Sequence, residues 1–257
     1  MATSNTPDTT DNIVEKYVPA QRTANISQVL QDNVGTSITE FDLDRIGTPP
    51  GGATQWQVPD LEGIKSVDAL EGIIVLWKEP RAYWATSFEE TGGGTPPDCS
   101  SPDSVKAVPD GMFAEGSDAN PTGECAKCPM SQWGSGGGRS QACKQMRVLF
   151  MIREGNALPE AVVLPPTSIG PMRRYFLRLA SKSVPYYGVV TRLKLERTKN
   201  ADGIGFAQVA PSLVQVLDDD TQERIRLYGE QFRALVDDSQ IIDATETYAE
   251  YAASDGS

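Results

Sequence analysis

Histidine is absent from the 257-residue chain. This absence excludes Ser-His and Cys-His nucleophile pairs, the commonest general base of enzymes, and every histidine-containing metal site. Aromatic residues are also few, at 7% of the sequence, and it contains neither a run of 18 apolar residues nor a charged-then-apolar N-terminus. We therefore expect a protein that is not an enzyme, has no secretory signal, does not span a membrane and is cytoplasmic.

Cysteine is rare, and its four residues all lie in one stretch rich in Gly, Pro and Ser: Cys99, Cys125, Cys128 and Cys143. Cys125 and Cys128 form a C-x2-C pair, and the other two stand 26 residues before and 15 residues after it. In a reducing compartment such a cluster favours metal ligands, with paired disulfides and free thiols as the alternatives. We predict a structural Zn²⁺ site, because four cysteine ligands leave no open position for water.

Short apolar runs separated by turn residues predict a mainly β protein with little helix. We expect strands at 72–78, 82–88, 146–153, 186–197 and 204–217, with a helix capped by Thr167 or Ser168 before the last pair. This set fits a small antiparallel barrel of the OB type. The predicted divisions are a mostly disordered segment 1–36, an OB-like domain 37–217 with a zinc-binding insertion 92–145, and a C-terminal helix with an acidic tail, 218–257.

The net charge of −12 conceals an uneven distribution. Between residues 139 and 199 there are twelve basic and three acidic side chains, a local charge of +9, whereas residues 218–257 have eleven acidic and three basic ones, a charge of −8. A basic segment with few acidic side chains between its cations, such as residues 139–199, is typical of proteins that bind polyanions. Single-strand binders also use aromatic rings on which bases stack. The predicted nucleic-acid contacts are Tyr83, Trp84, Trp133, Arg139, Lys144, Arg147, Arg174, Arg178, Lys182, Tyr186, Tyr187, Arg192 and Lys194.

Several segments resemble little-characterised proteins encoded by bacteriophages and mobile elements. They are 92–103 (GGGTPPDCSSPD), 123–129 (GECAKCP), 133–135 (WGS), 142–144 (ACK) and 164–169 (LPPTSI). The resemblance covers about residues 41–217 and implies a four-Cys zinc knuckle in a single-stranded DNA-binding protein of a bacterial host cell. The acidic tail is similar to those of bacterial and phage single-strand binders, which recruit replication and recombination proteins. It departs from them by ending in Ala-Ser-Asp-Gly-Ser, without an apolar tip.

The leading hypothesis is a non-catalytic, sequence-tolerant single-stranded DNA-binding protein of phage or mobile-element replication or recombination. The alternative is a protein-interaction module, such as a phage inhibitor or adaptor, that acts through the acidic tail. A third class is a carboxylate-metal nuclease, for which Asp42, Asp44, Asp60 and Glu62 are available. Scattered carboxylates of this kind are usually surface groups, so the third class is the least favoured.

Overall fold

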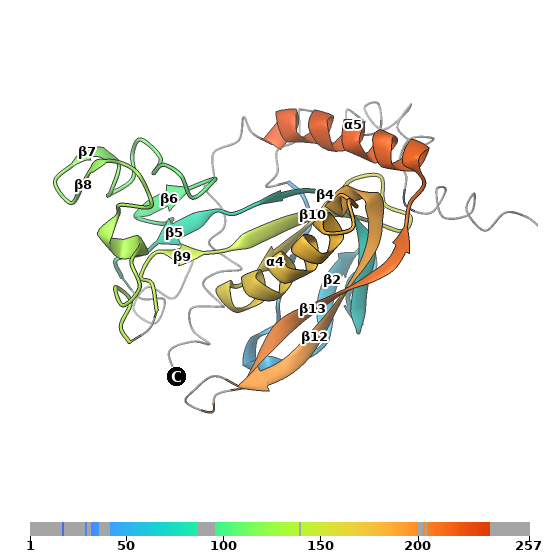
Figure 1. Cartoon of the computed structure of the whole chain (residues 1–257), viewed down its shortest axis with the longest axis horizontal. Coiled ribbons are helices and arrows are strands. Elements are labelled where there is room, and N and C mark those ends of the chain that lie inside the picture. The colour runs from blue at the N-terminus through green and yellow to red at the C-terminus, as the bar shows by residue number, and fades with distance from the viewer. Residues whose placement is uncertain are drawn as a thin grey trace, which may run out of the picture.

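A six-stranded mixed sheet lies at the centre of the protein in this computed structural model, which describes residues 17, 29, 32–35, 42–86, 96–138, 140–199, 203 and 205–236. The strand order is β1-β11-β10-β4-β12-β13. Figure 1 labels its strands β4, β10, β12 and β13. The strands are β1 (Arg45–Gly47), β4 (Ala69–Lys78), β10 (Arg147–Arg153), β11 (Glu160–Leu164), β12 (Val189–Lys199) and β13 (Gly205–Val216). Only β1 and β11 are parallel neighbours in this sheet. The predicted mainly β class is confirmed.

The central sheet is open, so the predicted OB-type barrel is wrong for the part of the chain that the structure describes. Its edges are β1 and β13, which do not pair with each other. The strands bury apolar side chains on both faces, and each face contributes to a separate hydrophobic core. Because a helix covers each face, the sheet buries its apolar surface without closing on itself.

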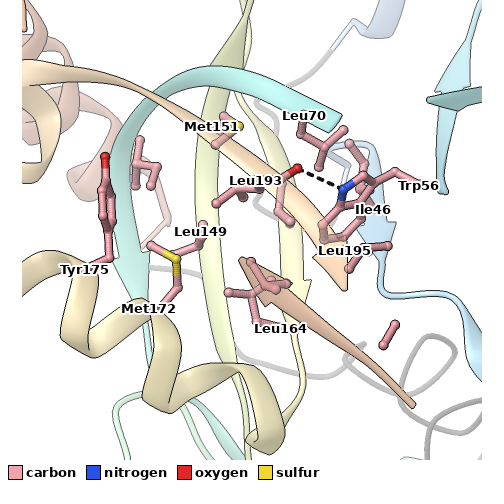
Figure 2. Close-up of a cluster of buried hydrophobic side chains, with 14 of the residues drawn as sticks. Ile46, Trp56, Leu70, Leu149, Met151, Leu164, Met172, Tyr175, Leu193 and Leu195 are labelled. Atoms are coloured by element: carbon pink, nitrogen blue, oxygen red, sulfur yellow. Dashed lines mark hydrogen bonds between the residues drawn. The ribbon is translucent and has the colours of Figure 1, made fainter. Parts of the chain in front are cut away.

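Helix α4 (Pro166–Ala180) covers one face of the sheet. Figure 2 shows its buried Met172 and Tyr175 beside the strand residues Leu149 and Leu193. The helix begins after Pro165 with no side-chain cap, contrary to the prediction. The hydroxyl of Ser168 instead accepts a hydrogen bond from the backbone N–H of Val209 at 3.0 Å, so it joins the helix to β13.

A hairpin of β2 (Trp56–Asp60) and β3 (Gly63–Val67) completes the core beneath α4. The side chain of Trp56 is fully buried there. Its indole Nε1 donates a hydrogen bond to the carbonyl oxygen of Leu193 at 3.1 Å (Figure 2). The hairpin is thereby tied to β12, far away in the sequence. A short 3₁₀ turn, η3 (Pro50–Gly52), precedes it.

Helix α5 (Asp219–Val236) covers the opposite face, as Figure 1 shows. Its Ile225 and Phe232 are buried against the sheet, and the ring of Phe232 lies 5.2 Å from that of Phe150. Asp218 caps the helix, because its carboxylate accepts a hydrogen bond from the backbone N–H of Thr221 at 2.9 Å. The predicted C-terminal helix is confirmed, whereas the tail 237–257 and most of the segment 1–36 lie outside the described residues.

Short strands build a second unit at one end of the sheet, which we call the cysteine subdomain (residues 81–83 and 96–145 as far as described). Strand β5 (Arg81–Tyr83) lies between β6 (Cys99–Ser101) and β9 (Lys144–Gln145). β7 (Glu115–Ser117), β8 (Asn120–Thr122) and the 3₁₀ turn η4 (Pro129–Ser131) complete it. In Figure 1 this subdomain projects away from α4 and α5.

Neither α4 nor α5, the long helices among the described residues, is apolar enough to cross a membrane. The segment Tyr186–Gly188 forms a 3₁₀ turn, η5, rather than the start of the predicted strand.

Candidate metal centre and nucleic-acid interface

All four cysteines line one small cavity in the cysteine subdomain. The cavity measures about 10 Å³, and Arg81, Tyr83 and Phe113 are among its other lining residues. Each cysteine is buried, and none forms a disulfide. A space of this size holds a single atom or ion rather than an organic ligand. The fold thus brings together the four residues that the sequence singled out.

The three-stranded sheet β6-β5-β9 explains how cysteines far apart in the sequence meet. Cys99 opens β6 directly opposite Tyr83 of β5. On the other side of β5, Ala82 pairs with Lys144 of β9, and Cys143 immediately precedes that pair. The two cysteines therefore flank β5 from opposite sides at the same level along the strand.

The remaining two cysteines belong to a tight C-x2-C turn with its own hydrogen bonds. The backbone N–H of Cys128 donates to the carbonyl oxygens of Glu124 at 3.1 Å and Cys125 at 3.3 Å. The hydroxyl of Ser131 donates to the carbonyl oxygen of Cys128 at 2.9 Å and also to that of Cys125. The backbone N–H of Cys143 donates to the carbonyl oxygen of Met130 at 2.8 Å. These bonds fix the turn beside the β5 strand.

Burial raises the pKa of three of the thiols, those of Cys99, Cys125 and Cys143. Desolvation is the largest cause at Cys99 and Cys125, and it raises the pKa of Cys143 to about 12. The guanidinium of Arg81 opposes this effect and lowers the pKa of Cys125 and Cys143. Protonated thiols have no charge that would draw a cation between them, so a metal must displace their protons to bind.

The cysteines line one cavity, but their side chains are not arranged in the coordination geometry of a metal site. Within the described residues, no group of three or more Cys, Asp or Glu side chains is arranged to hold an ion. All four cysteines nevertheless line one atom-sized cavity. Thiol rotamers adjust when an ion binds, whereas the strand pairing that gathers the cysteines is a property of the backbone.

The donor set suits Zn²⁺. Four sulfur ligands without a position for water make up a structural zinc site. The backbone of Phe113 donates a hydrogen bond to the sulfur of Cys99, and the side chain of Ser101 donates one to that of Cys125, and both bonds lower the thiol pKa. Hydrogen bonds of this kind favour the thiolate form that a metal needs.

The predicted nucleic-acid contacts fall in separate places rather than in one groove. Arg174, Arg178 and Lys182 are exposed on α4 and the turn that follows it, together with Arg173, which the sequence did not single out. The helix contains no acidic residue. Among the described residues, none of these four cations forms an ion pair. We call these four residues the α4 cations.

Arg192 and Lys194 lie on the other side of the sheet from α4. Along β12, Leu193 faces the α4 core, whereas Val190 packs in the α5 core. Side chains alternate along a strand, so Arg192 and Lys194 share the side of Val190. Arg192 is also paired with the carboxylate of Glu71. These two residues cannot form one continuous contact surface with the α4 cations.

Arg147 is buried, so its predicted contact with nucleic acid is wrong. Its side chain is 4% exposed and forms an ion pair with Glu79. The guanidinium carbon lies 4.8 Å from the ring centroid of Trp77 and 5.8 Å from that of Phe176. A cation enclosed in this way joins α4 to the sheet and cannot reach a phosphate.

Most of the predicted stacking rings are part of the packing. Tyr83 contacts Phe113 edge-on at 5.4 Å within the cysteine subdomain. Tyr186 packs on Phe176 at 5.6 Å, and Tyr187 is half-buried in the α5 core, as is Trp84.

Trp133 differs from these rings, because 78% of it is exposed. It lies in a loop whose backbone is closed by a hydrogen bond from the N–H of Gly134 to the carbonyl oxygen of Ser140 at 2.9 Å. Lys144 is partly exposed on β9, and Arg139 lies outside the described residues.

Three of the carboxylates considered for a nuclease line a second cleft, of about 680 Å³: Asp42, Asp44 and Asp60. Glu62 does not line it. Asp60 is paired with Lys65 at 2.8 Å, and Glu160, which also lines the cleft, is paired with Arg153 at 3.2 Å. No group of three or more carboxylates among the described residues is arranged to hold a metal ion. The nuclease hypothesis stays a prediction.

Comparisons of the chain with protein-family models, curated proteins and solved structures gave no match. The resemblance to phage and mobile-element proteins therefore stays a prediction.

Proposed function

We propose that the protein binds single-stranded DNA without catalysis and that the α4 cations make the main phosphate contacts. The observation that carries this proposal is a fifteen-residue helix with exposed arginines and no acidic residue. On an ordinary protein surface such cations are interleaved with carboxylates. Unpaired arginines on one rigid helix are suited to phosphate oxygens, which they bind in a bidentate manner. Binding along an exposed helix replaces the barrel groove that the sequence suggested.

Trp133 is the ring best placed to stack on a base. Its loop is held by the hydroxyl of Ser135, which donates hydrogen bonds to the carbonyl oxygens of Met130 at 2.8 Å and Gln132 at 2.7 Å. A fixed loop presents the indole at little cost in conformational entropy. Base stacking on such a ring contributes about 1–3 kcal/mol and tolerates any sequence.

The same proposal includes a structural Zn²⁺ ion held by Cys99, Cys125, Cys128 and Cys143. Four cysteines around one atom-sized cavity support it. The ion would stabilise a subdomain that has few apolar side chains of its own, and so hold the Trp133 loop in place. It would have no part in any reaction, because four protein ligands leave no site for a substrate.

Titration of the protein with labelled single-stranded and duplex oligonucleotides tests the function. We expect tight binding to oligo-dT that weakens steeply as the salt concentration rises from about 50 to 200 mM, with weaker binding to duplex DNA. Salt-independent affinity, or no detectable binding by zinc-loaded protein, would refute the proposal. Oligo-U in a parallel titration separates a DNA preference from general single-strand binding.

The alternative function is a protein-interaction module, such as a phage inhibitor or adaptor, that acts through the acidic tail, whose residues 237–257 lie outside the described part. The segment 237–257 has six acidic and no basic residues, a charge of −6, which favours this alternative. Removal of residues 237–257 separates the two functions, because it should preserve or strengthen DNA binding and abolish binding of a protein partner.

A further inference from the structure

Arg81 carries a buried nitrogen without a partner beside the four cysteines. Its Nη2 donates a hydrogen bond to the side-chain oxygen of Gln145 at 3.2 Å. Its Nη1 is buried and forms no hydrogen bond. Within the described part of the cysteine subdomain it is the one buried side-chain nitrogen or oxygen left unsatisfied. A buried nitrogen without a hydrogen-bond acceptor destabilises the fold unless a bound ion or ligand brings an acceptor within its reach.

The strand register places this guanidinium on the cavity. Arg81 and Tyr83 stand two residues apart on β5, so their side chains share one side of the strand, and both line the cysteine cavity. Ala82, between them, points into the core of the main domain. Arg81 pairs in register with Ser101 on one neighbouring strand and with Gln145 on the other.

The ionisable groups that line the cavity indicate which negative charge the Arg81 guanidinium neutralises. No carboxylate lines the cavity, so the cysteines are the only lining groups besides Tyr83 that can become negative. A divalent cation with four thiolates carries two net negative charges. Two disulfides or four protonated thiols are neutral and would leave the arginine without a counter-charge. Arg81 as a whole is partly buried, but its Nη1 is fully enclosed, and an enclosed cationic donor is costly unless it is paired.

We propose that Arg81 is a positioning residue of the metal centre: its guanidinium neutralises part of the negative charge of a divalent metal–tetrathiolate site, and Nη1 donates to a thiolate sulfur. This inference depends on the proposed zinc centre and adds a residue to it that no cysteine pattern contains. Groups that hydrogen-bond metal ligands typically change the metal affinity about 10- to 100-fold when they are removed.

Metal affinity in three variants tests this role. We would measure zinc content and then the dissociation constant by competition with a chromophoric chelator, in the wild type and in Arg81→Met, Arg81→Lys and Gln145→Leu. Arg81→Met should weaken zinc binding about 10- to 100-fold. Arg81→Lys should recover most of that loss, because it restores the charge. Gln145→Leu keeps the guanidinium but removes its Nη2 partner and the hydrogen bond from Gln145 to Glu79, and it should stay within about threefold of the wild type.

The possible results separate the existence of the metal centre from the role of Arg81 in it. A wild-type protein that binds no zinc would overturn the metal centre and this inference together. Zinc binding by the wild type with equal affinity in Arg81→Met would overturn the role of Arg81 and leave the centre intact. If Arg81→Lys were as weak as Arg81→Met, the charge argument would fail and a packing role would explain the loss. The Co²⁺-substituted proteins provide an independent check, since thiolate-to-metal absorption should show four sulfur ligands in every variant that binds.

Discussion

The double variant Arg174→Gln/Arg178→Gln tests whether the α4 cations contact phosphates. Both side chains are exposed, one helical turn apart, on a helix with no acidic residue. Glutamine has nearly the helix propensity of arginine, and neither position contributes to the buried core of Met172, Tyr175 and Leu179. The fold should therefore be retained while two positive charges are lost.

The expected loss of affinity follows from counterion release. Each phosphate neutralised on a single strand contributes about 0.7 to the slope of log affinity against log salt concentration, so loss of two contacts lowers the slope by about 1.4. If the salt-independent part of binding is unchanged, affinity in 0.1 M salt should fall about 25-fold. The difference from the wild type should shrink steadily as the salt concentration rises towards 1 M.

Fluorescence anisotropy of labelled oligo-dT at several salt concentrations measures both quantities. The matched control is Lys106→Gln/Lys127→Gln, which removes the same charge from the cysteine subdomain. There, Lys106 is paired with Glu115 at 2.9 Å and Lys127 with Glu124 at 2.6 Å. The control should keep the wild-type slope. An unchanged slope in the α4 variant, or an equal loss in both variants, would show that α4 is not the phosphate-binding surface.

Three further substitutions test the packing that positions α4 and α5. Gly229→Ala would place a methyl group 2.6 Å from the carbonyl oxygen of Val75, so it should force α5 off the sheet and cost about 1–3 kcal/mol in urea unfolding. The methyl group of Gly170→Ala would meet no atom nearer than 3.5 Å, so this variant should stabilise α4 by about 0.5–1 kcal/mol. A lower free energy of unfolding would show that the space beside Gly170 is not open. Asp218→Asn tests the α5 cap: hydrogen bonds from the side chain and then the backbone of Thr221 lower the pKa of Asp218. The ionised carboxylate therefore stabilises the folded protein at any pH above its unfolded pKa of about 4, and this stabilisation disappears as the pH falls through the lower pKa of the folded state. The free energy of unfolding of the Asp218→Asn variant should therefore decline less steeply at acid pH than that of the wild type.

Strands with a strong local pattern were predicted well from the sequence. The predicted strand 146–153 matches β10, and the predicted strands 186–197 and 204–217 overlap most of β12 and β13. The strand order could not be predicted, because it depends on contacts between distant segments. β4 lies between β10 and β12, and β1 adds a parallel strand at one edge, so the strands that suggested a barrel form an open sheet.

The predicted nucleic-acid contacts show a second limit of sequence patterns, which do not reveal on which side of the fold a cation lies. A count of cations identifies a basic region but cannot say which face each residue occupies. Arg147 resembles a surface cation in the sequence, but its partner Glu79 lies 68 residues away and buries it. Arg192 and Lys194 fall on the opposite side of the sheet from α4, because β12 alternates between the two cores. The helix cations were predictable, since the spacing of Arg174, Arg178 and Lys182 follows the helical period.

The cysteine pattern identified the candidate ligands, but only the strand pairing reveals how they connect to the rest of the protein. β4 runs into β5, and β9 runs into β10, so both central strands continue into the cysteine subdomain. The backbone N–H of Met146 donates a hydrogen bond to the carbonyl oxygen of Pro80 at 3.0 Å where the two units meet, and the adjacent Glu79 and Arg147 form the buried ion pair. Removal of the proposed zinc ion should therefore loosen more than an appended loop. It should also weaken the end of the central sheet at which Arg147 contacts α4, and hydrogen exchange at the backbone of Met146 would detect this change.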